Sequence, residues 1–526
     1  MQPEATRGPG LRDMFAVALV AALPLLLRAQ IPPVYWWDEA RIALNALEMM
    51  TTANPLVVTF NGEADLWNTK PPLAVWLSAL SMRAFGVNEL ALRLPALLAA
   101  MATVLAVFLF THRVSQSRAA AWLAALALLG TGGYVEVHVA RTADFDSLLV
   151  LFVTLATFSL LFAIERLDRA RDASKYLYAA AAFTAAAMFT KSIAGLLMIP
   201  GYALYLAWSG RTRALATCRA AWVAGGGVAA SILLFLVARE MAEPGFAQAA
   251  WATDASRFVT SGEGHVRPWY QYLMTLPWPW QQLSLQPMSE IPYVRSAFPW
   301  LWLVPLALLP LATLTAPLAS RSLASRASLY LLCCLLTFVA VISAAVSKLP
   351  WYLAPAYPLI AVLAALGVNQ VRLNFGADGA RLPRMAGLAA LPAGIALGVA
   401  CVAMNLWKTE KEIGTIQQSV EQRLPDFLRS EGFKLPPSAP LRIVREFSFR
   451  TPAVRDGRIV GTEIYDGPVE FYARLLRRQG RDAVVVGPGY DRQAGEVMIG
   501  CDAATGTNSR GLHVLAAKGS CIALGE

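Results

Sequence analysis

Apolar runs long enough to cross a lipid bilayer recur along most of this chain, and short basic loops separate them. Lipid offers no partner to backbone polar groups, so each run is expected to form a helix. The chain has 526 residues, of which 56% are hydrophobic and only 15% charged, whereas soluble domains carry about 25% charged residues. We count about eleven candidate spans, at roughly 14–27, 90–111, 118–136, 143–164, 175–190, 192–209, 218–239, 297–318, 327–346, 350–369 and 385–406.

The basic loops predict how these helices are oriented. With the N-terminus inside, the Arg-rich loops all fall on the cytoplasmic side, as the positive-inside rule requires. These loops are 112–118, 166–175, 211–219, 321–326 and 372–384. The net charge of +10 therefore reflects topology, and no nucleic acid is expected as a partner. The opposite, outer face receives 30–89, 137–143, 240–296, two tight corners at Lys191 and Lys348, and the C-terminal residues.

Two segments allow another interpretation. Met14 to Leu27 resembles a signal peptide, but no small-residue cleavage site follows and Arg28 ends the run, so we predict a first span. Pro71 to Phe85 is apolar but short for a crossing. Counting it as a span would place every later Arg cluster outside, so we predict a juxtamembrane helix within the outer loop 30–89.

The last part of the chain, 407–526, has the composition of a small soluble α/β domain. Short β-branched runs predict strands at Leu441–Val444, Arg458–Val460 and Ala483–Val486, and Val469–Arg478 has the pattern of an amphipathic helix. Cys501 and Cys521 lie in this domain, where an oxidising compartment would allow a disulfide, although the sequence leaves their pairing open. The fold class is thus a polytopic α-helical membrane protein of about 11–13 transmembrane helices, with residues 1–406 as the membrane domain.

Ionisable residues at membrane depth are costly and mark functional sites. The first group follows the first span, where Asp38, Glu39 and Arg41 come directly after two Trp residues. Asp38 could be a helix N-cap with an Arg salt bridge. Alternatively, the carboxylates act as a base or orient the substrate, beside an Arg that binds phosphate.

Further polar residues fall on the same predicted face, and each has a plain alternative role. Lys70 precedes Pro71 near a predicted helix N-terminus, where anions are favoured. Asp144 and Asp146 could be helix caps, and the two corner lysines could reach the membrane interface by snorkelling. Tyr352 stands four residues after Lys348 and could share its face. The candidate substrate-binding residues beyond the first group are Lys70, Arg141, Asp144, Lys191, His265, Lys348 and Tyr352, and Asp38, Glu39 and Asp146 are the candidate catalytic carboxylates.

Carboxylates and cations gathered on one face suit sugar transfer from a lipid phosphate. The leaving phosphate develops negative charge, which Lys and Arg stabilise in the transition state. A hydroxyl acceptor needs a base, for which Asp38 is the candidate, whereas an acceptor phosphate does not.

Several of these motifs resemble one family in their order along the chain. Asp38-Glu39-x-Arg41, Lys70-Pro71-Pro72-Leu73 with Trp76, Leu92-Arg93-Leu94-Pro95 and Lys348-Leu349-Pro350-Trp351-Tyr352 are similar to the protein O-mannosyltransferase superfamily, and most of all to its lipid A aminoarabinose transferase branch. The similarity covers about residues 30–370, and the opening loop is its most specific part.

The resemblance implies a third-class glycosyltransferase fold in a bacterial inner membrane, with its site on the periplasmic side. It also implies an inverting enzyme with a polyprenyl-phosphate sugar donor and an envelope lipid, glycan or protein acceptor. Asp38 and Asp146 would be the key carboxylates, and Lys70, Lys191 and Arg41 would bind phosphate. Aminoarabinose transferases usually carry Glu before Lys-Pro-Pro, associated with a metal together with a loop His. This chain has Thr69 there and keeps His265, so a divalent metal at His265 stays open.

Three other functions would use similar residues. A lipid-linked sugar flippase would place polar groups near the membrane midplane, often in internal repeats, whereas here they lie at one face and no repeat is evident. A ligase for lipid-diphosphate-linked oligosaccharides would share the outer site and differ in its donor. A noncatalytic envelope assembly protein would tolerate replacement of Asp38.

Overall fold

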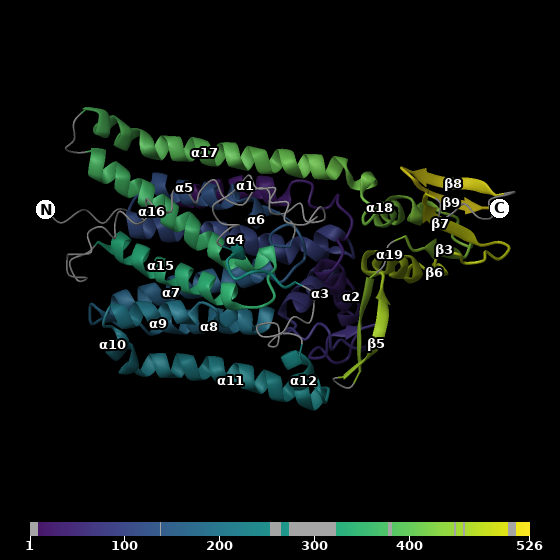
Figure 1. Cartoon of the computed structure of the whole chain (residues 1–526), viewed down its shortest axis with the longest axis horizontal. Helices are drawn as coiled ribbons and strands as arrows, with labels where there is room; N and C mark the ends of the chain where they lie inside the picture. Colours follow the sequence, from purple (N-terminus) through teal and green to yellow (C-terminus); the bar gives the residue numbers. More distant parts are fainter. Residues whose placement is uncertain are drawn as a thin grey trace. The chain divides into compact units, whose positions relative to one another are not determined.

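The computed structural model describes residues 9–136, 138–252, 265–272, 322–376, 381–446, 449–455, 458–502 and 512–526. The chain divides into two compact units (Figure 1). The first comprises Met1–Leu27, Thr69–Ala74 and Pro95–Leu406, and the second comprises Arg28–Asn68, Val75–Leu94 and Trp407–Glu526. Most of the predicted outer loop 30–89 thus groups with the C-terminal residues.

Long helices that run alongside one another build the first unit (Figure 1). Short 3₁₀ segments, η1 and η8, interrupt them next to the two predicted corners. The elements of this part of the chain are α1 (Leu11–Leu26), α4 (Glu89–Ser115), α5 (Arg118–Leu129), α6 (Gly132–Val135), α7 (Asp146–Leu167), α8 (Ser174–Lys191), η1 (Ser192–Leu196), α9 (Ile199–Trp208), α10 (Thr212–Ala216), α11 (Arg219–Ala242), α12 (Phe246–Ala250), α15 (Leu323–Ala344), η8 (Pro350–Ala356), α16 (Tyr357–Gly376) and α17 (Arg381–Gly414).

Among the described residues, seven helical segments are long and apolar enough to cross a membrane. They are Glu89–Ser115, Asp146–Leu167, Ser174–Leu196, Arg219–Ala242, Leu323–Ala344, Pro350–Asn374 and Gly387–Gly414. The other predicted spans fall on α1, α5 and α9, which have only 16, 12 and 10 residues, and on 297–318, which lies outside the described residues. The prediction of a multispan helical membrane protein is confirmed.

The helices of the first unit pack closely through small residues, as is usual in membrane bundles. A Cβ added to Gly201 of α9 would lie 2.4 Å from Cα of Cys334 in α15. No side chain larger than hydrogen fits there without moving the backbone of one helix. Tyr330, also on α15, donates a hydrogen bond of 3.0 Å to the Thr157 carbonyl of α7, which satisfies a buried hydroxyl.

In its described residues, the second unit combines short helices with three small sheets. The five-stranded sheet has the order β6-β3-β7-β9-β8, with β3 parallel to both of its neighbours and β9 antiparallel to both of its own. The elements are α2 (Asp38–Met49), β1 (Thr59–Phe60), β2 (Glu63–Ala64), α3 (Leu73–Phe85), η9 (Ile416–Gln418), α18 (Arg423–Ser430), η10 (Gly432–Lys434), β3 (Leu441–Val444), β4 (Phe449–Arg455), β5 (Arg458–Tyr465), α19 (Gly467–Arg478), β6 (Ala483–Val486), β7 (Val497–Cys501), β8 (His513–Lys518) and β9 (Cys521–Gly525).

The predicted elements of the C-terminal domain are confirmed. The three predicted strands correspond to β3, β5 and β6, and the predicted amphipathic helix corresponds to α19. Cys501 and Cys521 form a disulfide between the paired strands β7 and β9. The segment predicted as a juxtamembrane helix forms α3, which has 13 residues, while its place relative to a membrane stays a prediction.

A buried guanidinium holds the start of the second unit together. Arg93, which is fully buried, makes two hydrogen bonds of 2.7 and 2.8 Å to Glu39. It also donates to the carbonyls of Ala29, Pro32 and Pro33 at 2.7–2.8 Å. Proline-rich extended chain cannot pair its own carbonyls, so Arg93 supplies the donors that they lack.

We predict that Arg93→Leu destabilises the protein strongly, by about 3–5 kcal/mol, because the buried Glu39 loses its counter-charge. Thermal unfolding in detergent measures the change. The control is Arg28→Ala, which removes an exposed pair with Glu410 and should cost at most about 1 kcal/mol. Equal losses in the two variants would contradict the structural role of Arg93.

Candidate functional site

A pocket in the first unit gathers four of the residues predicted from the sequence. Its polar lining includes Lys70, Asp146, Lys191 and Tyr352, which come from distant parts of the chain. The rest of its lining is largely apolar and consists of Leu149, Ile193, Ala194, Leu197, Phe338, Ile342, Ala345, Ser347 and Pro355. The pocket is therefore amphipathic, with charged groups beside a wall of aliphatic and aromatic side chains.

An ion pair between Lys191 and Asp146 lies at the polar part of the pocket. The Lys191 Nζ is 2.7 Å from both carboxylate oxygens of Asp146, and both side chains are largely buried. Lys191 is the last residue of α8 and Asp146 the first of α7. Each charge thus sits at the helix end whose dipole favours it.

The backbone turns sharply at this corner. Ser192 has a φ of 50°, and α8 gives way to the 3₁₀ segment η1 at the same point. The Lys191 ammonium lies 5.5 Å from the ring centroid of Tyr352, within the range of a cation–π contact. Lys191, which the sequence predicts at a corner, therefore points into the pocket. Asp146 and Tyr352 hold it there.

Lys70 brings a second ammonium group to the pocket. Its Nζ lies 5.1 Å from the ring centroid of Phe145, the residue just before Asp146. The charged lining residues are thus two lysines and one aspartate. The excess positive charge beside an apolar wall suits an amphipathic anion.

The charged residues of the first outer loop differ in their burial and in their hydrogen-bond partners. Asp38 is half-buried at the first position of α2, and Trp37 rather than Asp38 occupies the N-cap position. Glu39 is engaged by Arg93 and also accepts a hydrogen bond of 2.8 Å from the Tyr35 amide. Arg41 makes two hydrogen bonds of 2.7 Å to Asp65. Glu39 is therefore paired with Arg93 of α4 and Arg41 with Asp65 of the loop, and their catalytic and phosphate-binding roles stay predictions.

Two other predicted cations bind main-chain carbonyls. Arg141 donates to the carbonyls of Pro24, Leu25 and Leu27 at 2.7–3.2 Å, which caps the C-terminal end of α1. Lys348 is buried and donates to the carbonyls of Arg267 and Ala345. Burial lowers the pKa of Lys348. The structure thus pairs Tyr352 with Lys191 in the pocket, rather than with Lys348 as the spacing of four residues suggested.

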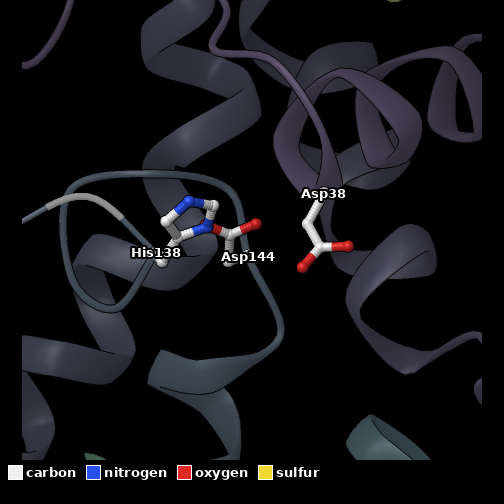
Figure 2. Close-up of side chains that lie close together, drawn as sticks. All are labelled: Asp38, His138 and Asp144. Carbon is white, nitrogen blue, oxygen red and sulfur yellow. The ribbon is translucent and has the colours of Figure 1, made fainter. Parts of the chain in front are cut away.

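A buried network around His138 was not identified from the sequence. His138 Nδ1 lies 3.3 Å from Oδ2 of Asp144 (Figure 2), and its ring stacks on Trp351 with centroids 4.0 Å apart. The hydroxyl of Thr142 donates to Asp144 at 2.5 Å. The available signal was a lone His in the outer loop 137–143, but its contact with Trp351 joins residues more than two hundred positions apart.

The metal predicted at His265 finds little support in the donor atoms around it. The side chain of His265 is exposed, and its carbonyl accepts a hydrogen bond of 3.0 Å from the Lys348 amide. Within the described residues, no group of three potential ligands includes His265. His138 and Asp144 are residue types that bind divalent metals, and Oδ1 of Asp144 is buried without a hydrogen-bond partner. A metal is compatible with that pair.

Comparison with known proteins is consistent with this arrangement. The family model of dolichyl-phosphate-mannose-protein mannosyltransferases matches residues 69–238, which include Lys70, Asp146 and Lys191. The undecaprenyl phosphate-α-4-amino-4-deoxy-L-arabinose arabinosyl transferase of Erwinia tasmaniensis is 26% identical over 356 residues, which cover 66% of this chain and 57% of the relative. The enzyme of the same description from Pseudomonas savastanoi pv. phaseolicola is 25% identical and 52% of each chain is covered.

A solved structure extends the similarity over nearly the whole chain. ArnT from Cupriavidus metallidurans, bound to undecaprenyl phosphate, superposes with a TM-score of 0.62 at 16% identity and covers 97% of both chains. The chain is thus similar in sequence to protein mannosyltransferases over residues 69–238 and to an aminoarabinose transferase over 66% of its length, and it is similar in fold to ArnT. Its helical membrane part and its small C-terminal sheet domain both follow the ArnT fold.

The buried Arg41–Asp65 pair predicts an acid-sensitive stability. Burial alone would raise the pKa of the Asp65 carboxyl, but the Arg41 guanidinium and hydrogen bonds from Asn45 and Asn68 lower it below the ordinary value. A lowered folded pKa stabilises the protein fully above the ordinary carboxyl pKa of about 3.9. That contribution is lost as the pH falls through the lowered value.

We therefore expect Asp65→Asn to lower the melting temperature at pH 7, because Arg41 loses its charge partner. The difference from the unsubstituted protein should begin to narrow below about pH 4, where Asp65 of the unfolded chain becomes protonated, and should narrow further as the pH falls toward the lowered pKa of the folded protein. Thermal unfolding in detergent between pH 3 and pH 8 measures this. Asp491→Asn, at an exposed position, serves as the control. A difference that stays constant with pH would show that Asp65 is not the titrating group.

Proposed function

We propose that the chain transfers a sugar from a polyprenyl phosphate carrier, such as undecaprenyl phosphate, to an acceptor in the bacterial envelope. The observation that carries this proposal is the amphipathic pocket with two lysines and a paired aspartate. A polyprenyl phosphate has the matching chemistry, with an anionic group next to an apolar chain. Lipid A, another glycan and a protein hydroxyl are the acceptor classes considered.

Lys191 and Lys70 are proposed to bind the phosphate of the donor. Lysine acts as a compact point charge that contacts phosphate without fixed geometry. Asp146 holds the Lys191 ammonium in place and supplies its counter-charge, since a buried ammonium without one is costly. When the donor binds, its phosphate oxygens interact with the ion pair of Lys191 and Asp146. The same cations then stabilise the negative charge that grows on the leaving phosphate.

In the proposed reaction, an acceptor hydroxyl oxygen attacks the anomeric carbon as the bond from that carbon to the phosphate oxygen breaks. The polyprenyl phosphate leaves with the bonding electrons, and the configuration at the anomeric carbon is inverted. The hydroxyl proton passes to Asp38, our candidate base, which begins α2 in the first outer loop. An acceptor that is itself a phosphate would need no base.

The sugar and the orientation are also proposed. The two curated relatives are named for 4-amino-4-deoxy-L-arabinose, so its undecaprenyl phosphate derivative is the first donor to test. We propose that the protein lies in the inner membrane with the pocket and the C-terminal domain on the periplasmic side. That orientation follows from the alternation of basic loops.

We expect Lys191→Met to weaken the binding of undecaprenyl phosphate by about 10-fold or more, as the loss of one charged hydrogen bond implies. Binding is followed in nanodiscs by the rise in melting temperature on adding the lipid. Lys175→Met is the control, since Lys175 is an exposed lysine at the start of α8.

Loss of Lys191 removes the counter-charge of the buried Asp146, so the effects on binding and on folding must be separated. The double variant Lys191→Met with Asp146→Asn removes both charges and should recover stability while binding stays weak. Recovery of binding in the double variant would contradict a phosphate contact by Lys191.

For transfer itself, we predict that Asp38→Asn lowers the rate by at least about 100-fold, the usual contribution of a general base. Proteoliposomes with radiolabelled polyprenyl-phosphate sugars and an envelope lipid extract provide the assay. Glu63→Gln, at an exposed position of the same loop, should transfer normally.

The possible outcomes of this assay distinguish between the competing functions. Transfer in the unsubstituted protein that is lost in a folded Asp38→Asn variant supports the proposal, and the labelled product identifies the acceptor. Normal transfer by Asp38→Asn would exclude Asp38 as the base. If no donor gives transfer, flipping of the same labelled lipids becomes the measurement that decides for a transporter.

A further inference from the structure

The residue before the proposed base has an unusual backbone. Trp37 has φ 70° and ψ −123°, a region that bulky L-residues rarely occupy. Such a conformation persists only where its surroundings hold it, and it is found most often at functional sites. The peptide that leads into Asp38 is therefore strained and needs an external support.

Tyr465, the last residue of β5 in the C-terminal domain, provides that support. Its hydroxyl donates a hydrogen bond of 2.9 Å to the Trp37 carbonyl. Its ring stacks on the Trp37 indole with centroids 6.5 Å apart and an interplanar angle of 25°, and it meets Trp36 edge-on at 6.1 Å. Tyr465 is only 3% exposed, so the contact is a built part of the second unit.

The backbone at Gly467 is shaped to bring Tyr465 close to α2. A Cβ added to Gly467 would lie 2.7 Å from the Tyr465 ring and 2.9 Å from the Ala40 Cβ. Both distances are below van der Waals contact, so any larger residue would separate the start of α19 from the first turn of α2. The absence of a side chain at Gly467 thus allows Tyr465 to lie close enough to the start of α2 for its hydrogen bond to form.

The far end of α2 is held by the same helix of the C-terminal domain. Arg474 on α19 pairs with Glu48 at 2.5 Å, and Arg478 donates to the Leu47 carbonyl at 3.1 Å. Both ends of α2 are therefore attached to α19 or to the strand just before it. A shift of the C-terminal domain would move Asp38 with it.

We infer that Tyr465 of the C-terminal domain is a positioning residue for Asp38, through its hydrogen bond to the Trp37 carbonyl. The inference rests on the proposed function, in which Asp38 takes the acceptor proton. The Trp37 carbonyl accepts two hydrogen bonds, one of 2.9 Å from the Tyr465 hydroxyl and one of 3.0 Å from the Arg41 amide of α2. The hydroxyl is thus the contact from the C-terminal domain that orients the peptide between Trp37 and Asp38. Without that bond the strained peptide relaxes and the Asp38 backbone moves, although the fold of the domain remains.

The test compares Tyr465→Phe with the full-length parent protein in nanodiscs. Phenylalanine keeps the ring and loses only the hydroxyl. We expect kcat for sugar transfer to fall about 10-fold or more, because misplacement of a catalytic group by a fraction of an ångström has this effect. The KM for the polyprenyl-phosphate donor and the melting temperature should stay near the parent values, since neither the pocket nor the core changes.

Amide hydrogen exchange supplies a readout that does not depend on activity. In Tyr465→Phe, exchange should rise in peptides that cover residues 37–41 and stay unchanged in the five-stranded sheet. Gly467→Ala should also raise exchange in the peptides that cover residues 37–41, because the added methyl group disturbs the contact from the α19 side. The control is Tyr490→Phe, because the hydroxyl of Tyr490 contacts Glu496 within the C-terminal domain and not a residue of α2.

The two proposals fail in different ways. Parent kcat and parent exchange in Tyr465→Phe would overturn the positioning role of Tyr465, whatever Asp38 does. Unaltered kcat with increased exchange would overturn it as well, since the moved peptide would then not matter for transfer. Normal transfer by Asp38→Asn would instead refute Asp38 as the base, and the inference would fall with it.

Discussion

An ammonium group beside an apolar wall needs a counter-charge, and Asp146 supplies it to Lys191 with two contacts of 2.7 Å. The pair joins the end of α8 to the start of α7, so it also fixes the corner where α8 gives way to η1. An incoming anionic group can then bind to a Lys191 ammonium whose position is already fixed. The ion pair thus links the packing of the helices to the chemistry that we propose for the pocket.

Arginine and lysine have separate tasks in this chain. Arg41, Arg93 and Arg141 each use several guanidinium donors on fixed carboxylates or carbonyls, which suits the planar fork of that group. Lys70 and Lys191 line the pocket instead. A guanidinium with all its donors used has little left for a substrate, whereas an ammonium paired with one carboxylate can still contact a phosphate. This difference supports our proposal that the lysines bind the phosphate.

The sequence predicts much of this architecture because helices and corners are local properties. Apolar runs and basic loops mark the spans, and the corners at Lys191 and Lys348 appear as breaks between helices. The contacts of the side chains are not a local property, because they join residues that are far apart in the sequence. The spacing of four residues suggested that Tyr352 accompanies Lys348, but Lys348 turns to main-chain carbonyls and Tyr352 lies beside Lys191. His138 was missed for the same reason, since its stacking partner Trp351 follows far along the chain.

The grouping of the first outer loop with the C-terminal domain has a physical cause. The loop segments of the second unit amount to about 60 residues, a length at which a core alone gives marginal stability. The loop therefore completes its core with residues of the C-terminal domain. Tyr472 shows how, because its buried hydroxyl accepts a hydrogen bond from the Val34 amide and donates one to Glu89. A loop stabilised in this way depends on a separate part of the chain for its shape, and the position of Asp38 depends on it too.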